Sequence, residues 1–169
     1  MTRIGISIAV PEPFGTRLRE ARASFGDPQA ATVPSHVTLL PPDDVGDSCL
    51  EVVRRALADV AATTKAFDMS LQGTGTFRPV SPVVFVAVSR GISETELLAS
   101  RLREAVGPPP ADFPFHPHVT VAQHLDDAAL DRAYTELSDF SCDFRVSEFS
   151  LYLHDDADGW IADQSFALA

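Results

Sequence analysis

The order of predicted strands and helices repeats near the middle of the chain. Hydrophobic spacing, turn residues and capping pairs mark the elements of each half. In the first half they predict a strand at 4–10, a helix over 14–25, a short strand at 36–40 ended by Pro41-Pro42, a helix beginning at a Ser48–Glu51 capping box, and a strand at 67–73. In the second half they predict a strand at 83–88, a helix beginning at a Ser93–Glu96 capping box, a short strand at 118–122, a helix from Asp127, and a closing hairpin of 140–153 with 160–168. Each half therefore has the order strand, helix, strand, helix, strand, which is typical of a duplicated unit.

This repeat predicts an α+β protein with two similar lobes. The lobes are expected to cover about residues 1–80 and about 81–169, to be related by a pseudo-twofold axis, and to enclose a central cleft. A length of 169 residues suits one domain of two intimate lobes rather than two independent domains. The equivalent short strands of the two lobes would then lie near one another at the cleft.

The two short strands carry the same three residues, His-Val-Thr. The motifs begin at His36 and His118, which lie 82 residues apart, close to half the chain. Because alternate residues of a strand point to the same face, His36 projects together with Thr38, and His118 projects together with Thr120. Each lobe is thus expected to present one imidazole and one hydroxyl to the shared cleft.

These groups suit the cleavage of a phosphodiester without a metal ion. Water attacks phosphorus roughly opposite the leaving oxygen, so a general base and a general acid must stand on opposite sides of the phosphate. A neutral and a protonated histidine can fill these roles near neutral pH. The motifs leave open which of His36 and His118 is the base. The hydroxyls of Thr38 and Thr120 can donate to the non-bridging oxygens, where negative charge must be held.

Two other interpretations of the histidines compete with this one. A single His-x-Thr in a strand is most often a partly buried histidine with a hydrogen bond, but two copies at equivalent positions favour catalysis. His116, His118 and His124 could form a metal cluster, although Pro117 disturbs the strand and no familiar zinc spacing is present. We therefore predict neither a metal ion nor another cofactor.

The charge of the chain limits its partners. Thirteen Lys and Arg oppose 24 Asp and Glu, which gives a formal net charge of −11. Proteins that grip long nucleic acid neutralise phosphates with a basic surface, so we expect a small phosphodiester or an RNA end as substrate and no long duplex. The polar first residues and the lack of a long apolar run lead us to expect no signal peptide and no membrane span. Cys49 and Cys142 have no metal or redox spacing. We expect a cytoplasmic monomer without membrane contact.

The chain resembles the two-histidine phosphoesterase superfamily, in particular its 2′-5′ RNA ligase and cyclic phosphodiesterase branch. The resemblance covers nearly the whole chain and rests on both His-Val-Thr motifs, on Gly73-Thr74-Gly75-Thr76-Phe77, and on the Phe-Pro-Phe-His-Pro-His run at 113–118. It implies a bilobal fold with a central cleft and metal-free hydrolysis of 2′,3′-cyclic phosphates to 2′-phosphates. In some members it also implies reversible 2′-5′ ligation. The residues that match the family's functional positions are His36, Thr38, His118 and Thr120.

Four further residues are candidate substrate contacts. Many relatives carry Arg or Lys three residues after the second Thr, where this chain has Gln123, so a charge-assisted contact is missing and activity on RNA ends is less expected. Phe77 and Phe115 could stack on a base, with core packing as the equal alternative. Arg78 could supply local positive charge or be a solvated surface side chain.

The leading hypothesis is a hydrolase that opens a cyclic phosphodiester of an RNA end or small nucleotide to a phosphomonoester. A non-catalytic protein that binds a phosphorylated nucleotide is the alternative. The neutral Gln123 and the acidic surface are the observations that motivate it.

Overall fold

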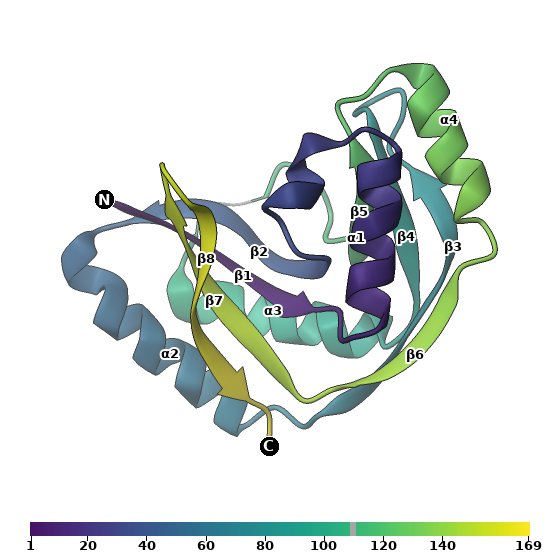
Figure 1. The fold of residues 1–169 in the computed structure, drawn as a ribbon. Coiled ribbons are helices and arrows are strands. Elements are labelled where there is room, and N and C mark those ends of the chain that lie inside the picture. The colour runs from purple at the N-terminus through teal and green to yellow at the C-terminus, as the bar shows by residue number, and fades with distance from the viewer. Residues whose placement is uncertain (109–110) are drawn as a thin grey trace.

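Two four-stranded antiparallel sheets form the centre of the computed structural model, which describes residues 1–108 and 111–169 (Figure 1). The first sheet has the order β2-β1-β7-β8 and the second has the order β5-β4-β3-β6. The strands are β1 (Thr2–Ala9), β2 (His36–Val45), β3 (Phe67–Thr76), β4 (Val83–Arg90), β5 (His118–Gln123), β6 (Ser141–Val146), β7 (Glu148–Asp155) and β8 (Gly159–Ala167). The helices are α1 (Phe14–Ser24), α2 (Leu50–Ala62), α3 (Ile92–Val106) and α4 (Asp127–Glu136), with 3₁₀ turns at Pro28–Ala31 and Asp47–Cys49.

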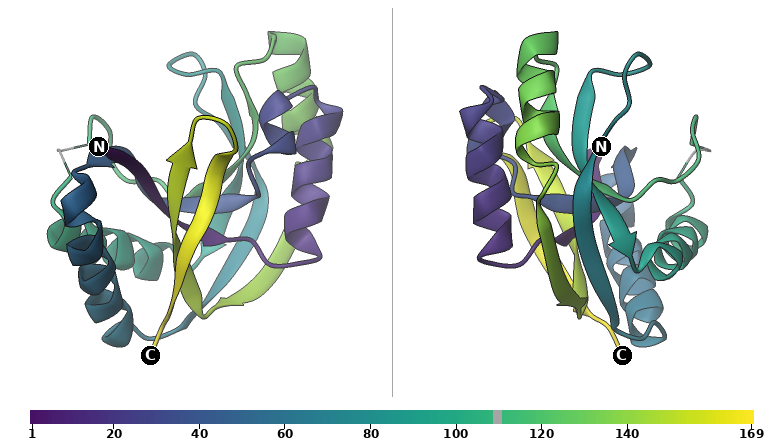
Figure 2. Two further views of the ribbon diagram at one scale, coloured as in Figure 1. Left: turned by 60° about the vertical axis from the view of Figure 1, so that its left-hand side comes forward. Right: turned by 90° about the vertical axis from the view of Figure 1, so that its right-hand side faces the viewer.

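The two sheets correspond strand by strand, which confirms the pseudo-twofold arrangement of two α+β lobes. β2 and β1 in the first sheet take the places of β5 and β4 in the second, and β7 takes the place of β3. Helices α2 and α3 pack together beside the first sheet, whereas α4 packs on β3, β4 and β5. Figure 2 shows the two groups of helices on opposite sides of the molecule with the sheets between them.

The sheets do not divide the chain at its middle. β3 belongs to the first half of the sequence but pairs with β4, and β7 and β8 return from the C-terminus to pair beside β1. Helix α1 follows β1 yet packs on β5, and α3 follows β4 yet packs on β2. The lobes expected at about 1–80 and 81–169 therefore differ from the two sheets, because each sheet takes elements from both halves.

Three local predictions need correction. The strand that begins at His36 does not end at Pro41-Pro42 but continues to Val45, because β2 is an edge strand whose pairing with β1 is irregular there, and an edge tolerates proline. Neither predicted capping box forms: α2 begins after Cys49 and α3 begins after Gly91, both without a side-chain cap. The predicted strand at 140–153 is two strands, of which β6 pairs with β3 and only β7 forms the hairpin with β8.

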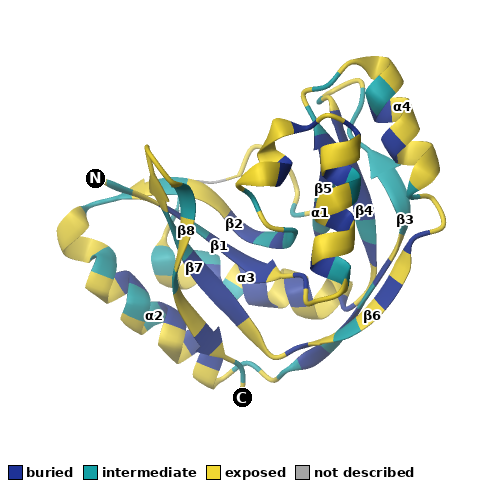
Figure 3. Ribbon diagram, in the orientation of Figure 1, coloured by how far each residue is buried: buried dark blue, intermediate teal, exposed yellow. Residues whose placement is uncertain are grey.

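The apolar residues of the strands and helices form one core. Val37, Leu39, Val119 and Val121 are fully buried between their sheets and the covering helices, as the alternation of the two motif strands predicts. Figure 3 shows the buried stretches along the central strands and the exposed outer faces of the helices. No helix in the described part of the chain has the length and hydropathy needed to cross a membrane.

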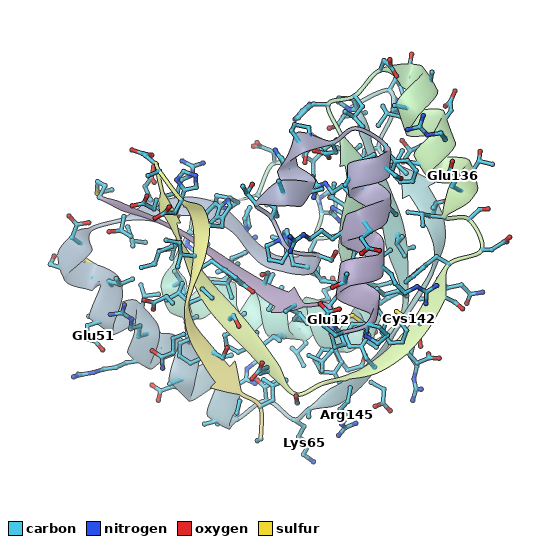
Figure 4. The ribbon with its side chains drawn as sticks, in the orientation of Figure 1. Glu12, Glu51, Lys65, Glu136, Cys142 and Arg145 are labelled. Atoms are coloured by element: carbon cyan, nitrogen blue, oxygen red, sulfur yellow. The ribbon has the colours of Figure 1, made fainter. Side chains whose placement is uncertain are left out.

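Charged side chains lie mainly on the outside of this core. Figure 4 shows Glu51 on α2, Glu136 on α4 and Arg145 on β6 projecting outward from the ribbon. Both cysteines are free thiols; Cys49 is exposed and Cys142 is buried, and burial raises the pKa of the Cys142 thiol.

Candidate active site

The two His-Val-Thr motifs meet where the two sheets approach each other. β2 and β5 are the edge strands of their sheets and pack against one another. Their registers match: β1 places Ala9 opposite His36, and β4 places Ala87 opposite His118. The structure thus brings together the two histidines that the duplicated motif predicts.

Each histidine is held by the same backbone hydrogen bond. Nδ1 of His36 lies 2.7 Å from the carbonyl oxygen of Pro34, and Nδ1 of His118 lies 2.6 Å from the carbonyl oxygen of His116. A carbonyl only accepts, so Nδ1 carries a proton in both rings and Nε2 is the atom that gains or loses one. Neither Nε2 has a hydrogen-bond partner among residues 1–108 and 111–169. Both are therefore available to a ligand.

The surroundings favour the neutral form of both rings. Burial lowers the pKa of His36, and the positive charge of Arg22 lowers it further, while the bond to Pro34 acts in the opposite direction. Burial also lowers the pKa of His118, with smaller contributions from the charges of His116 and His36 against the bond to the His116 carbonyl. Since a charge on His36 is felt at His118, protonation of one ring disfavours protonation of the other. This suits a pair in which one member is the base and the other is the acid.

The two threonines lie beside the histidines and are half-buried. Thr38 pairs with Ser7 across β1, and Thr120 pairs with Phe85 across β4. Neither hydroxyl makes a hydrogen bond to another residue that the structure describes. Both can donate to an oxygen of a bound phosphate.

A buried ion pair lies next to the site, and no motif in the sequence indicates it. Arg22 and Asp27 are 4% and 3% exposed, and Nε of Arg22 lies 2.8 Å from Oδ2 of Asp27. A second guanidinium nitrogen donates to the side chain of Gln29 at 3.0 Å. The available signal was the position of Arg22 on the apolar stripe of α1, four residues after Leu18 and three before Phe25.

Aromatic rings fill the space beside His118. The rings of Phe77 and Phe85 lie 5.0 and 5.1 Å from the His118 ring, and His116 stacks on it at 5.9 Å. Phe77, a predicted substrate contact, is therefore next to the histidine. Phe115 is half-buried and packs against the core.

The other two predicted substrate contacts, Arg78 and Gln123, interact with neighbouring side chains of the protein. Arg78 forms ion pairs with Asp131 at 2.8 Å and Asp127 at 3.6 Å, both on α4. Gln123 ends β5, and its side-chain nitrogen lies 3.1 Å from Nε2 of His124. No group of three His, Cys, Asp or Glu side chains in the described segments is arranged to hold a metal ion.

Known proteins share both the sequence pattern and the fold. The model of the 2′-5′ RNA ligase superfamily matches residues 10–158. A Bacillus cytotoxicus protein named as a candidate phosphoesterase is 28% identical over 168 residues, which cover 98% of this chain and 96% of the relative. Escherichia coli LigT in complex with 3′-AMP has a TM-score of 0.69 at 20% identity, covering 99% of this chain and 98% of LigT. The protein TT0787 of Thermus thermophilus has a TM-score of 0.71 at 23% identity, covering 98% of this chain and 97% of its own.

Proposed function

Because this chain belongs to the 2′-5′ RNA ligase superfamily, we propose that it hydrolyses a cyclic phosphodiester to a phosphomonoester without a metal ion. The proposed substrate is the 2′,3′-cyclic phosphate of a small nucleotide or an RNA end. The observation that carries the proposal is the pair of matched hydrogen bonds that leave Nε2 of His36 and of His118 free.

The proposed reaction uses each of these nitrogens once. Nε2 of the neutral histidine takes a proton from water as the water oxygen bonds to phosphorus. The bond from phosphorus to the 3′ oxygen breaks, and the protonated histidine gives its Nε2 proton to that oxygen. The products are a 2′-phosphate and a 3′-hydroxyl. Thr38 and Thr120 donate to the non-bridging oxygens while charge builds on them.

The same geometry can serve ligation. If a 5′-hydroxyl replaces water as the nucleophile, attack on the 2′,3′-cyclic phosphate yields a 2′-5′ linkage and releases the same 3′-hydroxyl. The family to which the chain belongs supports this second use.

Two further observations support a small, nucleotide-like substrate. Structures of Escherichia coli LigT were solved with 3′-AMP, with ATP and with phosphate. The net charge of −11 disfavours long nucleic acid on the remaining surface of this chain.

The test is hydrolysis of nucleoside 2′,3′-cyclic phosphates in EDTA by the wild type, His36→Ala, His118→Ala and the surface control Lys65→Ala. Each histidine variant is expected to lose about 10²–10⁴-fold in kcat, the usual contribution of a general acid or base. The control, an exposed residue, should match the wild type. Loss of wild-type turnover on chelation, or turnover that survives both histidine substitutions, would overturn the proposal.

The neutral Gln123 favours one alternative, a protein that binds a phosphorylated nucleotide without turning it over. Calorimetry with nucleoside 2′-monophosphates distinguishes the two. Binding without hydrolysis of any cyclic phosphate, retained in the double variant of His36 and His118, is the result expected of a binding protein.

A further inference from the structure

The two halves of the site differ at one pair of equivalent positions. Ser7 lies opposite Thr38 in the first sheet, and Phe85 lies opposite Thr120 in the second. The small side chain leaves space beside His36, whereas the corresponding space in the second sheet is filled by a phenyl ring. In the pseudo-symmetric site a cavity therefore lies beside His36, whereas aromatic rings pack beside His118.

This cavity lies on the first sheet. It has a volume of about 90 Å³, larger than the roughly 10–15 Å³ that one water molecule needs, and it is continuous with His36 and Thr38. Its far wall is aromatic, formed by Tyr152 of β7 and Trp160 of β8. The Trp160 ring lies over Gly5, where an added Cβ would be 3.4 Å from the indole. Because Gly5 has no side chain, the six-membered ring of the indole can approach β1 closely.

Two hydroxyl groups, those of Ser7 and Thr38, line this cavity. Ser7 pairs with Thr38 of β2 on one side and with Ser150 of β7 on the other. Ser150 does not line the cavity, and its hydroxyl lies 2.9 Å from that of Ser165. Ser7 is only 6% exposed and lines the cavity. Its hydroxyl has no hydrogen-bond partner among the residues that the structure describes. No buried side-chain oxygen or nitrogen among the described residues lacks a partner, so the unpartnered Ser7 oxygen is accessible and can bond to a ligand in the cavity.

We propose that this cavity binds the nucleoside of the substrate, with the ribose at Ser7 and the base against Trp160; this inference rests on the proposed function. Moving outward from the histidines, the site offers imidazole and hydroxyl, then a free hydroxyl, then an aromatic face. A nucleotide offers phosphate, then ribose hydroxyl, then a flat heterocycle in the same order. An aromatic face can stack on any of the bases. The cavity is therefore expected to favour nucleosides over other groups but to discriminate little between different bases.

Trp160 is the single tryptophan of the chain, so the intrinsic tryptophan fluorescence reports on binding in this cavity. Titration of the wild type with adenosine 2′-monophosphate is expected to quench the intrinsic fluorescence saturably, while inorganic phosphate is expected to leave it unchanged. Equal quenching by both ligands, or none by the nucleotide at concentrations that calorimetry shows to be saturating, would contradict the placement of the base.

Substitutions of Trp160 and Ser7 distinguish the loss of base stacking from a loss of folding. Trp160→Ala is expected to raise KM for a nucleoside 2′,3′-cyclic phosphate about tenfold with little change in kcat, the effect of losing one base–aromatic stack. Trp160→Phe keeps an aromatic face and should recover most of the affinity. Ser7→Ala is expected to raise KM a few-fold. Tyr134→Ala, on the exposed face of α4, is the matched aromatic control. An unchanged KM in folded Trp160→Ala would overturn the inference.

The hydrolysis and fluorescence results together distinguish failure of the proposed function from failure of the cavity assignment. If no cyclic phosphate is hydrolysed but the nucleotide still quenches Trp160, the cavity binds a nucleoside and the chain is a binding protein. If hydrolysis proceeds and Trp160 does not respond, the reaction stands and the cavity assignment is wrong.

Discussion

Oδ2 of Asp27 accepts a hydrogen bond from the backbone N–H of Gln123 at 3.1 Å. Asp27 follows helix α1 in the first half of the chain, whereas Gln123 ends the strand that carries the second motif. The same carboxylate holds Arg22, whose charge acts on His36. One buried ion pair therefore fixes the end of β5 and contributes to the electrostatics of the histidine on β2.

We expect Arg22→Met to destabilise the protein and raise the pKa of His36. The substitution leaves the carboxylate of Asp27 buried without its charged partner, which typically costs about 3–5 kcal/mol of unfolding free energy. Urea denaturation measures this loss, with Arg19→Met on the exposed face of the same helix as the control. A variant as stable as the control would show that the pair is not important to the fold.

The pH dependence of kcat/KM is expected to be bell-shaped with its maximum on the acidic side of neutrality. The proposed mechanism requires one neutral and one protonated histidine, and the pKa values of both His36 and His118 are lowered from the ordinary value of about 6.5. The active protonation state is most populated between the two lowered values. Rates measured across a series of buffers at constant ionic strength test this, and a maximum above pH 7 would contradict it.

The same shifts predict that the protein loses stability as the pH falls. A histidine with a lowered pKa binds fewer protons when folded than when unfolded, so the free energy of unfolding rises with pH. The stabilising contribution is fully present above about pH 6.5 and is lost as the pH falls through the folded pKa values of His36 and His118. Thermal denaturation between about pH 7.5 and about pH 5.5 measures this, a range in which ordinary carboxylates stay ionised. The double variant His36→Gln, His118→Gln should show a shallower dependence; an equal slope would assign the effect to other groups.

Gly75→Ala is expected to impair catalysis through Phe85. A Cβ at residue 75 would lie 2.5 Å from Cζ of Phe85, so this ring, 5.1 Å from the His118 ring, would have to move. Such overpacking usually costs about 1–3 kcal/mol of stability. We expect kcat to fall more than in the control Gly46→Ala, where the nearest atom is 3.5 Å away.

Adding Phe85→Leu to Gly75→Ala makes room for the new methyl group. Recovery of stability and kcat in this double variant would confirm the steric cause. Failure to recover either would point to the backbone of β3 instead.

Much of the fold was predictable because it depends on local patterns. The alternation of His36-Val37-Thr38 determines which side chain faces the core, and this holds whichever strand lies beside it. The exchange of β3 and β7 between the sheets was not predictable in this way. A buried strand has the same alternation in either sheet, so its sequence does not specify its neighbour.

The residues of the site likewise differ in whether a local pattern or a distant pairing places them. His36, His118 and their threonines were found because a repeated motif marks them. Ser7 and Trp160 were not, because their roles depend on the pairing of β1 with a hairpin from the opposite end of the sequence. Each looks like an ordinary strand residue until β1, β7 and β8 lie side by side.

The exchange of elements between the two sheets also sets the order in which the chain can fold during synthesis. The second sheet has all its strands once residue 146 has left the ribosome, but β1, made first, lacks its neighbour β7 until residues 148–155 follow. β1 must therefore remain unpaired on one side until β7 is made, and the first sheet closes after the second. Contacts of such long sequence separation form slowly. A chain stalled before β7 would leave one edge of β1 unpaired, and such an exposed edge can pair with another chain.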